Sequence, residues 1–210
     1  MHVYFVRHGE TEANRKHRHQ SANTPLSVWG RNMMVTCAET LRSVNPDILI
    51  TSEYTRAVES AEILGTNLGL KPISNELFYE IIRPSKFYTD SVFSFETIWY
   101  VIVSIMKRND PSWRYADAEN LHDIESRAEK ALRYIESLHG KHQSVVIVSH
   151  SVFINVMVAY MCRSTTLDIR SLLHTFFDVG RMKNAAVVHL QYVGSDTPYT
   201  CAWKIHHDIV

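Results

Sequence analysis

The sequence predicts an α/β protein, a three-layer α/β/α sandwich with a mostly parallel central sheet and a helical insertion. Short apolar runs alternate with segments whose apolar residues recur at helical intervals, which is the pattern of strand–helix units. The apolar run 3–6 is followed by Arg7 and His8, and the apolar run 144–149 is followed by His150. Because ligands bind beyond the carboxyl ends of the strands in such sheets, both histidines are candidate site residues.

Length and charge limit the classes of protein to consider. A chain of 210 residues can bury a substantial core, and we expect one domain over 1–210. The 22 basic residues balance the 22 acidic ones, so no general attraction to nucleic acid or to an anionic membrane is expected. Any anion-binding site must therefore be local.

The cysteines and the apolar stretches predict a cytoplasmic location. The chain has three widely spaced cysteines, Cys37, Cys162 and Cys201. Their odd number and wide spacing argue against a disulfide framework and against a thiolate metal site. We see no signal-peptide pattern at the first residues. The longest apolar stretch, 98–106, is far shorter than the roughly 20 residues of a membrane-spanning helix.

The first third of the chain predicts two strand–helix units. The strand at 3–6 is followed by a polar loop at 10–24 and by a helix at 26–44, which Asn45-Pro46 ends. A second strand at 47–52 leads into a helix at 54–68 that closes at Gly69. Arg56 lies in the first turn of that helix, where the helix dipole disfavours a cation, so a ligand is one reason for its presence.

The middle and last parts contain the insertion and the remaining elements. A strand is expected at 71–77, and the aromatic segment 81–117 reads as a lid-like helical insertion over the active site, although plain core packing would also explain its apolar face. The clearest amphipathic pattern predicts a helix at 118–138. The later elements are a strand at 144–149, a helix at 152–161, a strand at 184–190 and an edge strand at 202–207.

Groups suited to an anion follow three of the predicted strands. They are Arg7 with His8, then Arg56, then His150, and they converge if the strands are parallel neighbours. Guanidinium groups bind phosphate oxygens in a planar, bidentate manner. Nearby cations also disfavour imidazolium, which would leave a histidine neutral and nucleophilic at pH 7. Glu80, at the end of the fourth predicted strand, would supply a proton to a leaving oxygen.

Several ordered motifs resemble the histidine phosphatase superfamily, also called the phosphoglycerate mutase-like family, nearly from end to end. The opening Arg7-His8-Gly9-Glu10-Thr11 with Asn14 is similar to the family's first signature. The other matching stretches are Pro25-Leu26-Ser27 with Gly30, Ser52 to Glu62 with Arg56, Glu119-Asn120 with Asp123 and Arg127, and Val148-Ser149-His150.

The resemblance implies catalysis through a phosphohistidine. His8 would attack the phosphorus, Arg7, Arg56 and His150 would bind the phosphoryl oxygens, and Asn14 would touch the phosphate. Glu80 would act as acid and then as base. The stretch after Glu80 departs from the family pattern, so Glu76 is the second choice for the acid.

We therefore expect a metal-independent phosphatase, with no cofactor, that hydrolyses a phosphomonoester. Its expected partner is a small-molecule substrate, with a phosphoprotein left open, and the sequence sets no oligomeric state. The alternatives are phosphoglycerate mutase-type phosphoryl transfer and a non-catalytic phosphate-recognition module.

Overall fold

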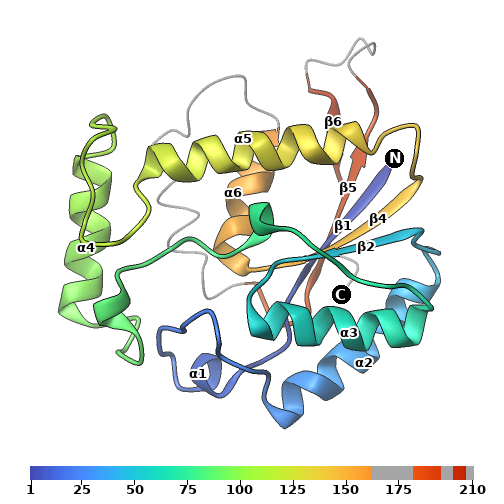
Figure 1. Ribbon diagram of the computed structural model, residues 1–210, viewed down its shortest axis with the longest axis horizontal. Helices are drawn as coiled ribbons and strands as arrows, with labels where there is room; N and C mark the ends of the chain where they lie inside the picture. Colours follow the sequence, from blue (N-terminus) through green and yellow to red (C-terminus); the bar gives the residue numbers. More distant parts are fainter. Residues whose placement is uncertain (162–181, 195–200, 207–210) are drawn as a thin grey trace.

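A six-stranded sheet in the order β3-β2-β4-β1-β5-β6 forms the middle of the molecule (Figure 1). The computed structural model describes residues 1–161, 182–194 and 201–206. The strands are β1 (His2–Arg7), β2 (Ile48–Thr51), β3 (Ile73–Ser74), β4 (Ser144–Ser149), β5 (Val187–Tyr192) and β6 (Trp203–Ile205). The neighbours β3, β2, β4 and β1 are parallel, and only β5 runs against them, which confirms the predicted α/β class.

Helices cover both faces of the sheet. They are α1 (Glu12–Arg15), α2 (Val28–Arg42), α3 (Thr55–Leu68), α4 (Phe95–Met106), α5 (Leu121–Ser137) and α6 (Ser151–Met161), with the 3-10 turns η1 (Glu76–Phe78) and η2 (Ser85–Phe87). Alternate residues of β1 enter different cores: Tyr4 and Val6 pack with α2 and α3, whereas Val3 and Phe5 pack with α5 and α6. A strand with both faces buried needs apolar residues at nearly every position, which explains the continuous runs in the sequence.

The order of the strands places the functional edge. β4 lies between β1 and β2 and is parallel to both, with Arg7 opposite Ser149 and Thr51 opposite Val148. All three strands therefore end at one level of one edge. The segments that follow them, which carry His8, Arg56 and His150, start side by side.

Local signals set the ends of the helices where the sequence placed them to within a few residues. Ser27 begins α2, and its Oγ accepts a hydrogen bond from the Gly30 N–H at 2.9 Å. Gly69 ends α3 in the left-handed region at φ 72°, a conformation that suits glycine. Asn120 and Asp123 form a capping box at the start of α5.

The structure differs from the sequence prediction in two elements. The strand predicted at 71–77 is reduced to Ile73 and Ser74, both exposed, because Asn75 caps η1 by accepting a hydrogen bond from Leu77 N–H at 2.9 Å. The short helix α1 was not predicted. At the far edge, the predicted last strand is present as β6, which pairs with β5 among the described residues.

The insertion 81–117 contains η2 and α4. Its residues Phe87 and Tyr100 form a small core with Ala118, which directly follows the insertion. The remaining apolar face of α4 is turned outward, with Phe95 at 75% exposure and Trp99 at 49%. Plain core packing therefore does not account for the whole aromatic pattern, and its role as a lid stays a prediction.

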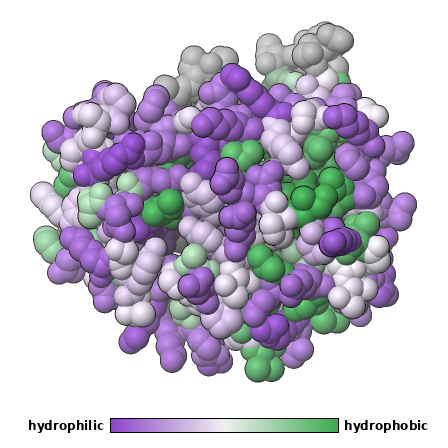
Figure 2. Space-filling view, viewed as in Figure 1, coloured by the Kyte–Doolittle hydropathy of each residue, from purple (hydrophilic) through white to green (hydrophobic). Residues whose placement is uncertain are grey.

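The cysteines and the surface complete the description. Cys37 is buried as a free thiol, whereas Cys201 is disulfide-bonded, which weakens the argument from cysteine number and spacing against disulfide bonding. The cytoplasmic location remains a prediction without that support. No helix in the described ranges combines the length and the apolar character needed to cross a bilayer. The face shown in Figure 2 is mostly hydrophilic, with hydrophobic residues in separate patches.

Candidate active site

The structure brings together the two histidines that follow β1 and β4. The ring centroids of His8 and His150 lie 5.2 Å apart, and both side chains are buried. Arg56, in the first turn of α3 beyond β2, donates from Nε to His8 Nε2 at 3.3 Å. Three segments that lie far apart in the sequence thus meet at one point.

His8 is held as a neutral imidazole with a defined tautomer. Its Nδ1 lies 2.7 Å from the Gly9 carbonyl oxygen, which can only accept, so the proton resides on Nδ1. The lone pair is then on Nε2, where Arg56 donates. Burial, followed by the charges of Arg56 and Arg7, lowers the pKa of His8 well below 6.5. His8 therefore carries an available nucleophilic nitrogen at pH 7.

The turn after β1 is fixed by α2 and α3. Gly9 N–H donates to Ser60 Oγ at 3.1 Å, and Ser60 Oγ donates to the Arg56 carbonyl oxygen at 2.6 Å. A methyl group on Gly9 would lie 2.5 Å from the Gly30 carbonyl oxygen, so the two backbones approach too closely for any side chain. This contact connects the position of His8 to the start of α2.

Arg7 and Arg56 supply buried positive charge beside His8. Burial lowers the pKa of each guanidinium to about 10, against a raising effect from Glu80, and both stay protonated at neutral pH. Arg56 also donates to the Ser21 carbonyl oxygen at 2.9 Å, and Arg7 donates to that of Met182. Arg7 Nε is buried without a hydrogen-bond partner among the described residues.

His150 has one satisfied ring nitrogen and one unsatisfied. Its Nε2 lies 2.9 Å from Ser52 Oγ, at the end of β2, while Nδ1 is buried and unpartnered within the described part of the chain. Burial, then the charge of Arg56, lowers the pKa of His150 well below 6.5. The ring of Tyr54 contacts it edge-on at 5.3 Å between centroids. Buried polar nitrogens without a partner are costly unless a ligand pairs with them. Arg7 Nε is therefore a candidate contact for an anion, and so is His150 Nδ1 in the tautomer that carries its proton there.

Asn14 lies at the rim of this group, on α1. Its Oδ1 accepts hydrogen bonds from Thr11 N–H at 3.2 Å and from Asn184 Nδ2 at 3.2 Å. Asn184 Nδ2 also lies 3.2 Å from the His8 carbonyl oxygen and can donate to it. The amide oxygen of Asn14 is thus used inside the protein, which leaves its nitrogen as the group that a phosphate would meet.

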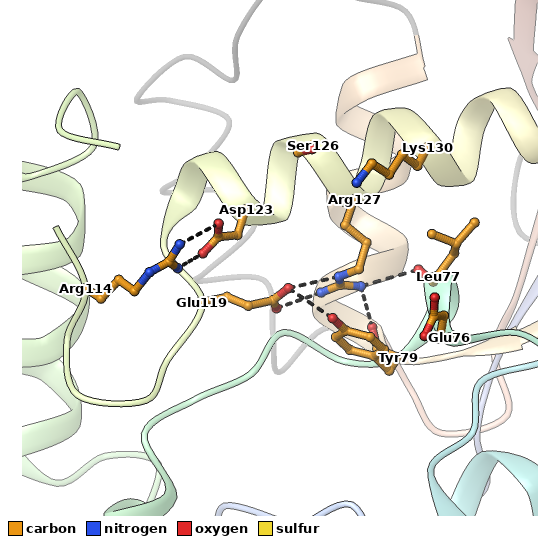
Figure 3. A pocket seen from close by; sticks show the side chains of 9 residues that line it. All are labelled: Glu76, Leu77, Tyr79, Arg114, Glu119, Asp123, Ser126, Arg127 and Lys130. Atoms are coloured by element: carbon orange, nitrogen blue, oxygen red, sulfur yellow. Dashed lines mark hydrogen bonds and ion pairs between the residues drawn. The ribbon is translucent and has the colours of Figure 1, made fainter. Parts of the chain in front are cut away.

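The two candidate acids lie in different places. Glu80 Oε1 accepts from Phe153 N–H, in the first turn of α6, at 3.1 Å, and its charge acts on both Arg7 and Arg56. Glu76 is exposed and lines a cavity of about 440 Å³ together with Tyr79, Glu119 and Arg127 (Figure 3). Neither His8 nor His150 lines that cavity. The geometry therefore favours Glu80 over Glu76.

Several contacts of the site were not predicted. Ser52, Tyr54, Ser60 and Asn184 all contact a predicted site residue or its backbone. Ser52, Tyr54 and Ser60 lie in the stretch 52–62 that resembles the family, and Ser52 also ends a predicted strand, whereas Asn184 carried no such signal. Across the described residues, no group of three or more His, Cys, Asp or Glu side chains is arranged to hold a metal ion.

The chain is similar in sequence to curated relatives and in fold to solved structures. A probable phosphoglycerate mutase GpmB of Klebsiella pneumoniae subsp. pneumoniae is 24% identical over 195 residues, which cover 91% of this chain and 85% of the relative. The structure of a mycobacterial glucosyl-3-phosphoglycerate phosphatase with VO3 matches with a TM-score of 0.74 at 20% identity, over 97% of this chain and 96% of that one. A mutant phosphoserine phosphatase from Entamoeba histolytica, in complex with phosphoserine, matches with a TM-score of 0.72 at 14% identity, over 99% and 95% of the two chains.

These structures share the fold, and the family follows from the sequence. The model of the histidine phosphatase superfamily (branch 1) matches residues 3–199, nearly the whole chain. The protein therefore belongs to the histidine phosphatase superfamily.

Proposed function

We propose that the protein is a phosphatase that hydrolyses a phosphomonoester through a phosphohistidine on His8. One observation carries this proposal: the unprotonated Nε2 of a buried, neutral His8 meets the guanidinium of Arg56, beside two buried nitrogens, Arg7 Nε and His150 Nδ1, that have no partner among the described residues. A nucleophile beside fixed positive charge is what phosphoryl transfer requires, because its transition state is stabilised mostly by position and electrostatics.

The first step forms the phosphohistidine. The lone pair of His8 Nε2 attacks phosphorus, and the bond from phosphorus to the leaving oxygen breaks. Arg7, Arg56 and His150 hold the three remaining phosphoryl oxygens, and Asn14 contacts one of them. Glu80 gives its proton to the leaving oxygen, which departs as an alcohol.

The second step releases phosphate. Glu80, now a carboxylate, takes a proton from water, and the resulting hydroxide attacks the same phosphorus as the bond to His8 Nε2 breaks. The guanidinium groups of Arg7 and Arg56 neutralise charge in both steps, so we propose that the reaction is metal-independent. Activity on p-nitrophenyl phosphate is then expected to survive dialysis against EDTA.

The direct experiment is to trap the intermediate. Rapid quenching of the wild-type protein with a 32P-labelled phosphomonoester is expected to leave label that is stable to base and labile to acid, as a phosphoramidate is. His8→Ala is expected to carry no such label and to lose about 10³-fold or more of the rate. Unchanged turnover in His8→Ala, or label that persists in it, would contradict the mechanism.

A mutase is the second candidate, and the names of the curated relatives favour it. A mutase must keep the phosphoryl group on the enzyme until a second hydroxyl accepts it, whereas a phosphatase admits water. Product interconversion that depends on a bisphosphorylated primer, with negligible release of phosphate, would assign the mutase reaction. Measuring kcat/KM over phosphorylated metabolites and phosphopeptides would then identify the substrate class. A protein that binds phosphate but does neither would be a recognition module.

A further inference from the structure

The proposed acid lies on a segment with little secondary structure of its own. Glu80 follows η1 and precedes η2, in a stretch without helix or strand. Its Oε1 accepts from its neighbour Ile81 N–H at 3.0 Å and from Phe153 N–H at 3.1 Å. The place of the carboxyl group therefore depends on whatever holds the backbone on both sides of Glu80.

Arg127 holds the backbone before Glu80. From α5, its NH1 donates to the Tyr79 carbonyl oxygen at 2.8 Å and to that of Leu77 at 3.4 Å (Figure 3). Its guanidinium carbon also lies 4.0 Å from the ring centroid of Tyr79 and 4.2 Å from that of Phe153. Arg127 therefore contacts both the segment that carries the acid and the residue whose N–H binds the carboxylate.

Glu119 holds the backbone after Glu80. Its Oε2 accepts from Ile82 N–H at 2.9 Å, and its own N–H donates to the Ile82 carbonyl oxygen at 3.0 Å. The same carboxylate binds Arg127 in a bidentate manner, with distances of 3.0 and 2.8 Å. Both side chains are less than a tenth exposed. Such a pair has a fixed geometry, because two parallel hydrogen bonds set its orientation.

We propose that Glu119 and Arg127 are positioning residues for the general acid, and this inference rests on the proposed function. The pair holds residues 77, 79 and 82 and supports Phe153, so the carboxyl of Glu80 keeps one position relative to the bound phosphate. A general acid contributes only when it lies within hydrogen-bonding reach of the oxygen that it protonates. Loss of the pair moves the acid without removing it.

The test uses two substrates whose leaving groups differ in their need for an acid. Phenyl phosphate releases a poor leaving group that must be protonated, whereas 2,4-dinitrophenyl phosphate releases a stable anion. Two variants remove the function of the pair, Glu119→Gln and Arg127→Lys. For each, the rate of the first turnover is measured by rapid mixing, since that rate reports formation of the phosphohistidine alone.

We expect a selective defect. First-turnover rates on phenyl phosphate are expected to fall about 10- to 100-fold in either variant, which is part of the rate that a general acid contributes. First-turnover rates on 2,4-dinitrophenyl phosphate are expected to fall less than about 3-fold, because its leaving group needs no proton. Steady-state turnover of the dinitrophenyl ester is expected to fall as well, because Glu80 also activates water in the second step. Added to Glu80→Gln, Arg127→Lys is expected to have no further effect on phenyl phosphate.

The matched control is Arg114→Lys. Arg114 pairs with Asp123 at the same cavity, and like Glu119 and Arg127 the two residues are close in sequence (Figure 3). Neither of them has a hydrogen bond or ion pair to residues 77–82 among the described contacts. Both substrates are expected to react with it at the wild-type rate. Thermal unfolding of all variants shows which of them are folded.

Three outcomes would overturn the proposal. The first is an equal loss of first-turnover rate on both substrates in folded Glu119→Gln and Arg127→Lys. The second is an unchanged first-turnover rate on both substrates. The third is failure of both variants to fold, which would make the pair a determinant of folding instead. Failure of the proposed function looks different: Glu80→Gln itself would then show no dependence on the leaving group, or His8→Ala would remain active.

Discussion

At the residue scale, the reactivity of His8 depends on one carbonyl oxygen and two arginines. The Gly9 oxygen places the proton on Nδ1, and burial with Arg56 and Arg7 lowers the pKa of the ring. The same arginines that would bind the substrate therefore keep His8, the proposed nucleophile, neutral. A change that removes either effect would leave the histidine present but less reactive.

Arg56→Lys tests the need for a guanidinium at this position. Arg56 reaches His8 Nε2 with one nitrogen and the Ser21 oxygen with another, which the single ammonium of lysine cannot reproduce. We expect kcat/KM on p-nitrophenyl phosphate to fall about 10²- to 10³-fold, the usual effect of losing one transition-state donor. The control is Arg31→Lys, which alters a half-exposed pair with Glu59 and is expected to leave the rate unchanged. Equal rates in the two variants would contradict the assignment of Arg56.

At the element scale, the first turn of α2 supports the turn after β1. A methyl group on Gly30 would lie 2.0 Å from the Glu10 carbonyl oxygen, a backbone atom that cannot move aside alone. Ser27, which caps α2, also donates from Oγ to Glu10 Oε1 at 3.0 Å. The helix thus fixes the segment that presents His8.

Gly30→Ala is expected to destabilise the fold and reduce the activity together. Overpacking of this kind costs about 1–3 kcal/mol, and the displaced turn carries His8 with it. Urea unfolding measures the first effect, and kcat/KM the second. Thr36→Ala, at an exposed position of the same helix, serves as the control and is expected to have the wild-type free energy of unfolding and the wild-type kcat/KM. A Gly30→Ala protein of wild-type stability would show that the turn and the helix do not constrain each other.

A second connection between elements joins the polar loop after α1 to the insertion. Buried His19 lies between Thr97 Oγ1 at 2.9 Å, on α4, and Arg83 NH1 at 3.2 Å. Arg83 can only donate, so His19 Nδ1 is the acceptor. The proton of the neutral ring is then on Nε2, which donates a hydrogen bond to Thr97 Oγ1. Burial and then the charge of Arg83 lower the pKa of His19 to about 4.

This lowered pKa predicts a loss of stability in acid. Between pH 6.5 and about 4 the unfolded chain binds a proton that folded His19 does not, so the free energy of unfolding falls as the pH falls through this range. We expect the Tm of His19→Gln to fall less steeply over that interval than the wild-type Tm, since glutamine can make both hydrogen bonds without titrating. His122→Gln, at an exposed site on α5, is expected to follow the wild type. Parallel curves of Tm against pH for all three proteins would contradict a contribution of His19 to the loss of stability in acid.

At the scale of the whole molecule, the candidate site is a junction of separate units of the fold. Groups that follow β1, β2 and β4 meet at one edge, and Glu80 reaches the same place through the first turn of α6. An anion held there would contact several elements at once. Binding should therefore stabilise the fold as a unit.

Inorganic phosphate is expected to raise the Tm. At 100 times the Kd, binding adds about 2.7 kcal/mol to the free energy of unfolding, which for a chain of this size corresponds to a Tm shift of about 5–10 °C. Sodium chloride at equal ionic strength is the control and should produce no such shift. The Tm shift is expected to be smaller in Arg56→Lys. A wild-type Tm that does not change with phosphate would argue against a phosphate site at this edge.

The sequence alone determined the α/β class, the main helices and the residues that follow β1, β2 and β4, because these depend on local periodicity and on sharp changes from apolar to polar residues. It predicted a strand at 71–77 that is longer than the observed β3, because the Asn75 cap starts η1 directly after Ser74. Only the tertiary structure decided that the charge of Glu80 acts on Arg7 and Arg56 while Glu76 lines a separate cavity, and that Ser52 and Asn184 contact His150 and His8. Those contacts depend on strand order and on distances between segments 73 to 176 residues apart, which no local pattern encodes.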